Sequence, residues 1–157
     1  MASVIKFYRT GDAFGAFSNF APYPIEVDGK VWPTVEHYFQ AQKFVGTEHE
    51  EAMRREASPM VVARMGRDRD KPLRGDWELA KDGVMRTAVL AKFTQHPELR
   101  DRLLATGEAK IIEHTSNDSY WGDGGDGSGV NMLGIILMEV RDHLRRSAEP
   151  NDAADSR

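Results

Sequence analysis

Residues 34–44 read TVEHYFQAQKF, and this stretch best defines the fold. Apolar residues recur at helical spacing, and Thr34 is a residue type that caps helix N-termini. Glu36, Gln40 and Lys43 follow at i, i+4 and i+7, so they share one face of the predicted helix. Such a face is either a solvated flank or the wall of a pocket, and periodicity alone leaves both interpretations open.

Short β segments are predicted on both sides of this helix. Residues 24–32 alternate in polarity around Asp28-Gly29, a dipeptide typical of hairpin turns because Gly accepts positive φ. Residues 5–8 and 109–114 each fit a short strand. Residues 11–24 are rich in Gly and Pro, which indicates an irregular segment, but their four aromatic side chains predict a loop packed against the body.

Helices account for most of the remaining chain. Their expected spans are 48–57, 59–67, 77–94, 98–105 and 132–145. We expect Ser58 to cap the second of these, Asn131 or a neighbour to cap the last, and Leu79, Met85 and Phe93 to enter the core. The order lacks the βαβ rhythm of a doubly wound sheet. We predict a compact, helix-rich α+β fold with a few short strands. It forms a single domain over residues 1–146, followed by a polar, disordered tail over 147–157.

The composition excludes several classes of protein. The chain has 157 residues and no Cys, so disulfides, thiolate metal sites and Cys nucleophiles are absent. A net charge of −4 argues against a broad nucleic-acid-binding surface. The sequence has neither the roughly 20-residue apolar run of a membrane span nor the pattern of a signal peptide. We therefore expect a cytoplasmic protein that makes no membrane contact.

Familiar cofactor and catalytic motifs are absent or out of context. Residues 122–127 spell G-x-G-x-x-G, but polar residues precede them where a dinucleotide fingerprint needs an apolar strand. The His residues have no zinc-binding spacing, and no G-x-S-x-G or P-loop motif occurs. We expect neither a metal ion nor another cofactor.

The remaining candidates are polar and aromatic residues. Each of them also has an ordinary structural role that requires no functional site. Glu36 would complement the helix dipole, worth about 0.3–1 kcal/mol. Lys43 would extend along apolar surface to reach water, Trp77 would anchor the core, and Asp118 would form an Asx turn. Taken singly, none of these residues identifies a site.

Four ordered blocks of sequence together resemble the YbiA-like or NADAR family of N-glycosidases. The blocks are FSNFAPYPI (17–25), DGKVWPTVEHYFQAQKF (28–44), KDGVMRTAVLAKF (81–93) and NDSYWGDGGDGSGVNMLGIILMEVR (117–141). The resemblance implies a YbiA-like fold and hydrolysis of a C–N glycosidic bond at C1′ of ribose. It also implies catalytic roles for Glu36, Trp77 and Asp118, with Lys43 as a further candidate. The residues expected to bind the substrate are Ser18, Asn19, Phe20, Gln40, Arg74, Trp121, Gly122 and Asn131.

The implied chemistry suits these residues. Breaking a ribosyl C–N bond builds positive charge on C1′, which a carboxylate stabilises while a second group protonates the departing nitrogen. Glu36 and Asp118 supply two carboxyl groups, and the sequence does not say which is acid and which is base. In an alternative route, the sugar opens and Lys43 forms a Schiff base.

Three functions stay open. The first is an N-glycosidase that cleaves ribosylaminopyrimidine phosphate intermediates of riboflavin biosynthesis into base and ribose 5-phosphate. The second is a hydrolase that removes ADP-ribose from modified guanine in DNA or RNA, and the third is a non-catalytic ADP-ribose-binding module. The acidic charge favours a small-molecule substrate over a nucleic acid, and the two carboxylates favour an enzyme. The oligomeric state is not indicated.

Overall fold

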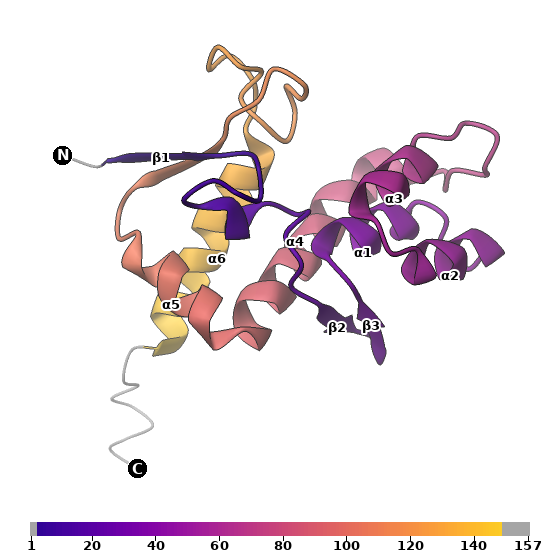
Figure 1. Cartoon of the computed structure of the whole chain (residues 1–157), viewed down its shortest axis with the longest axis horizontal. Coiled ribbons are helices and arrows are strands. Elements are labelled where there is room, and N and C mark those ends of the chain that lie inside the picture. Colours follow the sequence, from indigo (N-terminus) through magenta and orange to yellow (C-terminus); the bar gives the residue numbers. More distant parts are fainter. Residues whose placement is uncertain (1–2, 149–157) are drawn as a thin grey trace.

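The computed structural model describes residues 3–148, and its element order is seen in Figure 1. The elements are β1 Val4–Phe7, the 3-10 turn η1 Gly15–Phe17, β2 Ile25–Val27, β3 Lys30–Trp32, α1 Val35–Gln42, α2 Glu48–Arg55, α3 Pro59–Gly66, α4 Trp77–Gln95, α5 Pro97–Ala105, β4 Lys110–Glu113 and α6 Met132–Ala148. Residues 147 and 148, expected in a tail, belong to α6, and the rest of that predicted tail lies outside the described residues.

The helix α4 lies at the centre of the molecule and packs against α1, α5, α6 and β2. Figure 1 shows α1, α2 and α3 gathered on one side of α4, with α5 and α6 on the other. The result is a helix-rich α+β fold with two small sheets, as predicted.

The two sheets differ in the sequence separation between their paired strands. β2 and β3 form an antiparallel hairpin in which Ile25 opposes Trp32. Asp28 and Gly29 have φ values of 54° and 78°, which is the backbone that a two-residue hairpin turn requires. β1 and β4 pair in parallel, with Val4 opposite Lys110, so this sheet joins distant parts of the chain.

Side-chain caps at Thr34, Thr47 and Ser58 fix where three of the described helices begin. The Thr34 hydroxyl accepts a hydrogen bond of 3.2 Å from His37 N, and the Ser58 hydroxyl accepts one of 3.3 Å from Val61 N. Asn131, a candidate cap for α6, instead directs its side chain to β4 and has a φ of 58°.

The core extends from the N-terminal loop to α6. Phe17, from the aromatic loop, is 1% exposed and packs against Phe7 and Phe93, so this loop is indeed packed down. The expectation that Leu79 is a core residue is wrong, because it is 90% exposed. It lies two positions after the buried Trp77 and so faces the opposite side of the helix.

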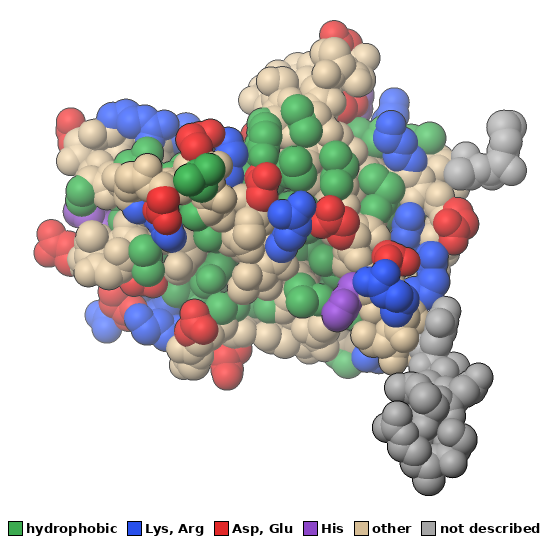
Figure 2. Space-filling view, turned by 180° about the vertical axis from the view of Figure 1, so that it is seen from behind, with side chains coloured by type: hydrophobic (Ala, Val, Ile, Leu, Met, Phe, Trp, Pro, Cys, Tyr) green, Lys and Arg blue, Asp and Glu red, His purple; other side chains and the backbone are tan. Residues whose placement is uncertain are grey.

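The surface mixes both signs of charge. On the face shown in Figure 2, Lys and Arg side chains alternate with Asp and Glu among hydrophobic groups. None of the helices in residues 3–148 is long and apolar enough to cross a membrane.

Candidate functional site

A cavity of about 570 Å³ opens between α1, α3, α4 and the loops that follow β1, η1 and β4. This volume is typical of a small-molecule site. Most of the residues predicted to form a site line this cavity. They are Ser18, Asn19, Phe20, Glu36, Gln40, Lys43, Trp77, Asp118 and Trp121.

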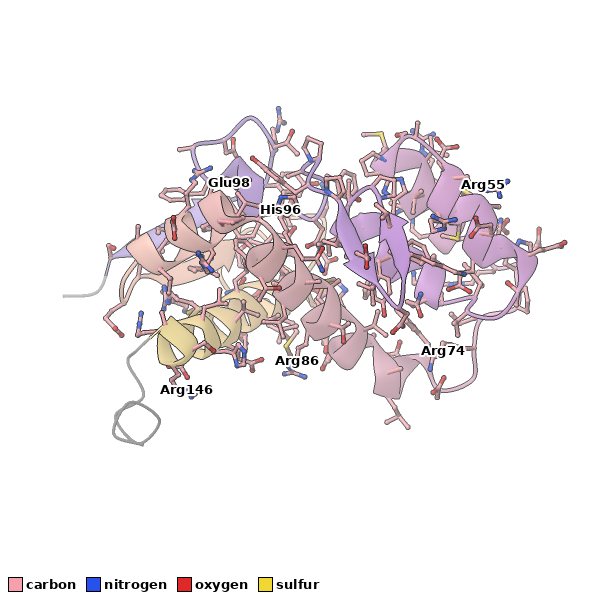
Figure 3. The ribbon with its side chains drawn as sticks, turned by 90° about the horizontal axis from the view of Figure 1, so that it is seen from below. Arg55, Arg74, Arg86, His96, Glu98 and Arg146 are labelled. Atoms are coloured by element: carbon pink, nitrogen blue, oxygen red, sulfur yellow. The ribbon has the colours of Figure 1, made fainter. Side chains whose placement is uncertain are left out.

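Three predicted substrate-binding residues do not line the cavity. Arg74, which Figure 3 labels, lies in the loop before α4 and pairs with Asp76 at 2.6 Å. Gly122 packs so closely that a Cβ would come within 2.9 Å of backbone carbonyls. The Asn131 side chain holds β4 through bonds of 2.9 Å to Glu113 N and to the carbonyl of Ile111. These three residues support the walls of the cavity.

The polar face of α1 is a wall of this cavity. Glu36, Gln40 and Lys43 are 7%, 7% and 9% exposed, which excludes the solvated flank. Gln40 Nε2 donates a hydrogen bond of 2.8 Å to Glu36 Oε2. Lys43 Nζ donates one of 3.2 Å to the carbonyl oxygen of Gly66, the last residue of α3.

Gly66 allows α3 to approach α1 at this point. A Cβ on Gly66 would lie 1.9 Å from Gln40 Oε1 and 2.7 Å from Gln40 Cδ. Gln40 Oε1 is buried and has no hydrogen-bond partner among the described residues. Gly66 therefore fixes where the Gln40 amide lies, and the amide in turn holds Glu36.

Burial shifts the ionisation of this wall in a way that favours neutral groups. Desolvation raises the pKa of Glu36, against the hydrogen bond from Gln40 and the positive charges of Lys43 and Arg67. Desolvation also lowers the pKa of Lys43, although the Glu36 carboxylate opposes that shift. A lysine amine whose pKa is lowered is more readily a nucleophile.

The opposite wall is the loop between β4 and α6. Asp118 Oδ1 accepts hydrogen bonds from Tyr120 N at 2.9 Å and Trp121 N at 2.8 Å, which is an Asx turn. Its Oδ2 has no hydrogen-bond partner within residues 3–148. The expectation that Asp118 forms an Asx turn is therefore confirmed, and Asp118 also lines the cavity.

Aromatic rings join the two walls. Phe39 of α1 lies 5.1 Å from the ring of Trp77 and 5.2 Å from that of Trp121, between centroids. All three rings line the cavity. They form an apolar surface against which a planar base could stack.

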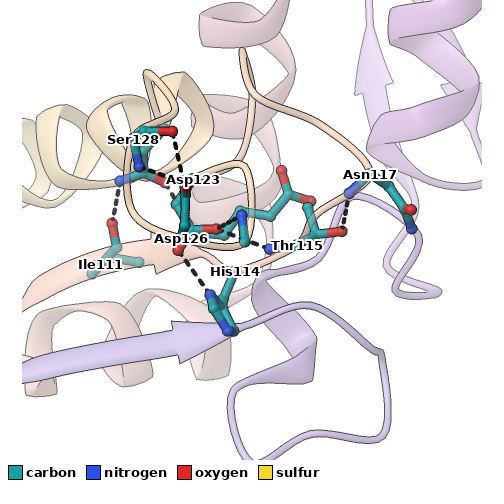
Figure 4. A network of polar contacts seen from close by, with 10 residues as sticks. Ile111, His114, Thr115, Asn117, Asp123, Asp126 and Ser128 are labelled. Carbon is teal, nitrogen blue, oxygen red and sulfur yellow. Dashed lines mark hydrogen bonds and ion pairs between the residues drawn. The ribbon is translucent and has the colours of Figure 1, made fainter.

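A buried carboxylate holds the Gly-rich part of the same loop, as Figure 4 shows. Asp123 accepts hydrogen bonds of 3.0 Å from Thr115 N and 2.9 Å from Gly125 N, and its Oδ2 lies 2.7 Å from His114 Nδ1. Desolvation raises the pKa of Asp123, but these bonds outweigh that effect and bring it to about 2. The loop is therefore internally braced.

Residues that the sequence did not single out also line the cavity, notably Arg9, Arg67 and Glu113. Burial, together with the charges of Asp118, Glu36 and Asp123, raises the pKa of Glu113 to about 8. Strand alternation contained a signal, because Glu113 lies two residues after the core residue Ile111 on the same side of β4. No comparable pattern pointed to Arg67.

The described residues contain no group of three or more His, Asp or Glu side chains that could hold a metal ion. The cavity instead offers carboxyl groups, an amine and guanidinium groups. This donor set is suited to proton transfer and to binding a polar organic substrate.

Comparison with known proteins identifies relatives over most of the chain. N-glycosidase YbiA of Escherichia coli (strain K12) is 63% identical over 142 residues, which cover 90% of this chain and 89% of that protein. An NMR structure of E. coli YbiA has a TM-score of 0.87 and 58% identity, covering 96% of this chain and 92% of that one. The Zea mays riboflavin biosynthesis protein PYRR, chloroplastic, is 41% identical over 90% of this chain and 25% of the maize protein.

The fold, the cavity with its carboxyl groups and these relatives define a class of protein, the glycosyl hydrolases that act on N-glycosidic bonds. A family model described as the NADAR domain matches residues 6–145. The chain therefore belongs to the NADAR domain family, which confirms the resemblance seen in the four sequence blocks.

Proposed function

We propose that this chain hydrolyses the bond between C1′ of ribose and the amine nitrogen of a ribosylaminopyrimidine phosphate, an intermediate of riboflavin biosynthesis. The products are the free base and ribose 5-phosphate. The observation that carries the proposal is the presence of Glu36 and Asp118, from distant segments, in the lining of one cavity. The likeness to a maize protein named for riboflavin biosynthesis supports the substrate class.

The charge distribution of the cavity matches such a substrate. Glu36 and Asp118 lie close enough that the charge of Asp118 raises the pKa of Glu36, so the two carboxyl groups can act on the same C1′. Lys43 and Arg67 are similarly close, because the charge of Arg67 lowers the pKa of Lys43. The Arg67 guanidinium has no hydrogen-bond partner among the described residues and is available to a phosphate group.

In the proposed reaction, a planar base stacks on Trp77 and Trp121 while the ribose lies against Glu36 and Asp118. The C1′–N bond breaks with its electron pair left on nitrogen, which takes up a proton. A carboxylate stabilises the cationic C1′ until water adds there, and a carboxylate accepts the proton that water loses. Gln40 holds Glu36 in place for this step through the 2.8 Å bond.

The buried amine of Lys43 supports a second route through the same site. Lys43 Nζ would add to C1′ of the ring-opened sugar and expel the base amine, which leaves a Schiff base that water then hydrolyses. Treatment with borohydride during turnover would trap this adduct on Lys43. If no adduct forms during active turnover, the reaction follows the direct route without a Schiff base.

A substrate panel tests the function. Wild-type protein is incubated with the ribosylaminopyrimidine phosphate, with DNA that carries ADP-ribosylated guanine, and with ADP-ribose. We expect base and ribose 5-phosphate from the first. Turnover of the DNA alone would assign the ADP-ribosyl-guanine hydrolase function instead, and tight ADP-ribose binding without any turnover would indicate a non-catalytic module. The mixed surface charge offers no broad basic area for DNA on the face in Figure 2.

A further inference from the structure

Glu113 is a third carboxyl group in the lining of the cavity, besides Glu36 and Asp118. It is the last residue of β4 and pairs with Phe7 of β1. Its backbone is held on both sides, since its N–H donates to Asn131 Oδ1 at 2.9 Å and its carbonyl accepts from Asp123 N at 2.9 Å. The position of this residue is therefore set by the sheet and by the loop together.

The turn that carries Asp118 folds back onto Glu113. A Cβ on Gly122 would come within 2.9 Å of the carbonyl oxygens of both Asp118 and Glu113, so only Gly allows this approach. The two carboxyl-bearing residues thus lie on adjoining backbone segments, and both line the cavity.

The three carboxyl groups differ in what holds them. Gln40 donates to Glu36, and two backbone N–H groups donate to Asp118. The Glu113 side chain has no hydrogen-bond or ion-pair partner within residues 3–148. The hydrogen bond from Gln40 opposes the desolvation that raises the pKa of Glu36, whereas no hydrogen bond opposes the desolvation that raises the pKa of Glu113.

We propose that Glu113 is the general acid of this site, which rests on the function proposed above. Its carboxyl proton passes to the glycosidic nitrogen as the C1′–N bond breaks, and the bonding electron pair stays on that nitrogen. Water adds to C1′ and gives its proton to Glu36 or Asp118. The net reaction adds one water across the bond, and proton exchange with solvent restores Glu113 and the base.

The electrostatics of the cavity support this role. A pKa of about 8 keeps the Glu113 carboxyl protonated at neutral pH, which a proton donor requires. The charged and titratable groups that share the cavity or lie beside it are Tyr8, Arg9, Glu36, Lys43, Arg67, Asp118, Asp123 and His114. Of these, the carboxylates at Asp118, Glu36 and Asp123 raise the pKa of Glu113.

The first test compares Glu113→Gln with wild type on two substrates. An acid is needed most when the leaving amine is poor, so we expect kcat/KM for the ribosylaminopyrimidine phosphate to fall about 100- to 10,000-fold. The matching 4-nitrophenyl riboside phosphate should lose less than about tenfold, because its leaving group departs as the stable 4-nitrophenolate anion and needs no proton. The matched control is Glu108→Gln, an exposed residue that pairs with Arg145, and it should match wild type on both. Equal losses on the two substrates, or no loss on either, would overturn the assignment.

The second test does not depend on turnover. Wild-type protein at neutral pH should show the infrared band of a protonated carboxyl group that Glu113→Gln lacks, and this band should disappear as the pH rises through about 8. In wild type, kcat/KM should fall over the same range. An identical band in both proteins would refute the acid role even if the proposed substrate is wrong. A correct band without cleavage of the pyrimidine substrate would refute only the proposed function.

Discussion

The two walls of the cavity are built in different ways. On α1, Glu36, Gln40 and Lys43 lie on one helical face and are held by side-chain contacts with each other and with Gly66. On the opposite wall, backbone N–H groups hold Asp118. Asn131 binds the strand β4, and Asp123 binds the loop that follows it. A helix places polar groups on one face by its periodicity. A loop has no such repeat, so separate hydrogen bonds must hold each change in the direction of its backbone.

The two walls are therefore sensitive to different substitutions. The helical wall keeps its backbone when one side chain is changed, so substitutions there should affect catalysis more than folding. The loop wall loses its shape when a supporting hydrogen bond is removed, so substitutions there should affect stability and catalysis together.

The largest effect is expected from Glu36→Gln in the helical wall. We expect turnover to fall about 1,000-fold or more, because the amide cannot stabilise the positive charge at C1′ or accept a proton. The midpoint of thermal unfolding should stay close to that of wild type, since the change removes a buried carboxyl group. Steady-state kinetics and thermal unfolding measure the two effects, and surviving activity would remove Glu36 from the mechanism.

Asn131→Ala should have the next largest effect, and mainly on stability. It removes two hydrogen bonds to β4 and places Ala at a φ of 58°. We expect the free energy of unfolding to fall by about 2–4 kcal/mol, measured by urea denaturation. Asn117→Ala, at an exposed position in the same loop, is the stability control and should lose less than about 1 kcal/mol. Equal losses in the two variants would show that Asn131 does not support the loop wall.

A smaller effect is expected from Gly66→Ala. The new Cβ must displace the Gln40 amide, which is flexible, so stability should change by less than about 1 kcal/mol while kcat/KM falls about tenfold. The acidic limb of the pH profile should move to higher pH, because the pKa of Glu36 rises further when it loses the hydrogen bond from Gln40.

Gly83→Ala is the matched control for that variant, since it lies in α4 with open space around it. It should leave activity unchanged and raise stability by roughly 0.5–1 kcal/mol. If Gly66→Ala behaves in the same way as this control, Gly66 does not position the helical wall.

The same contrast explains how much could be predicted from sequence. Helical spacing predicted the shared face of Glu36, Gln40 and Lys43, and the family resemblance favoured a pocket wall. The packing of α3 against α1 then buries this face. The hairpin followed from its Asp-Gly turn because all of its contacts are local. Local signals were thus sufficient for elements whose contacts are close in sequence.

Glu113 was not singled out because strand alternation gives only its side of β4, while its place in the cavity depends on distant pairing. β4 meets β1 from the other end of the chain, and no local pattern records that contact. Arg74 was predicted to bind the substrate, yet the neighbouring Asp76 binds Arg74 while Arg67 lines the cavity. Contacts of this kind appear only once the chain is folded.

In the proposed reaction, the helical wall and the loop wall act on one substrate in one step. A double-mutant cycle on kcat/KM with Glu36→Gln and Asp118→Asn tests it most directly, because Asn keeps the Oδ1 acceptor of the Asx turn. If the two carboxylates act as a unit, the double variant should lose no more than about tenfold beyond the worse single variant. If the loss in the double variant equals the product of the two single losses, the two walls act independently, which would contradict the proposed mechanism.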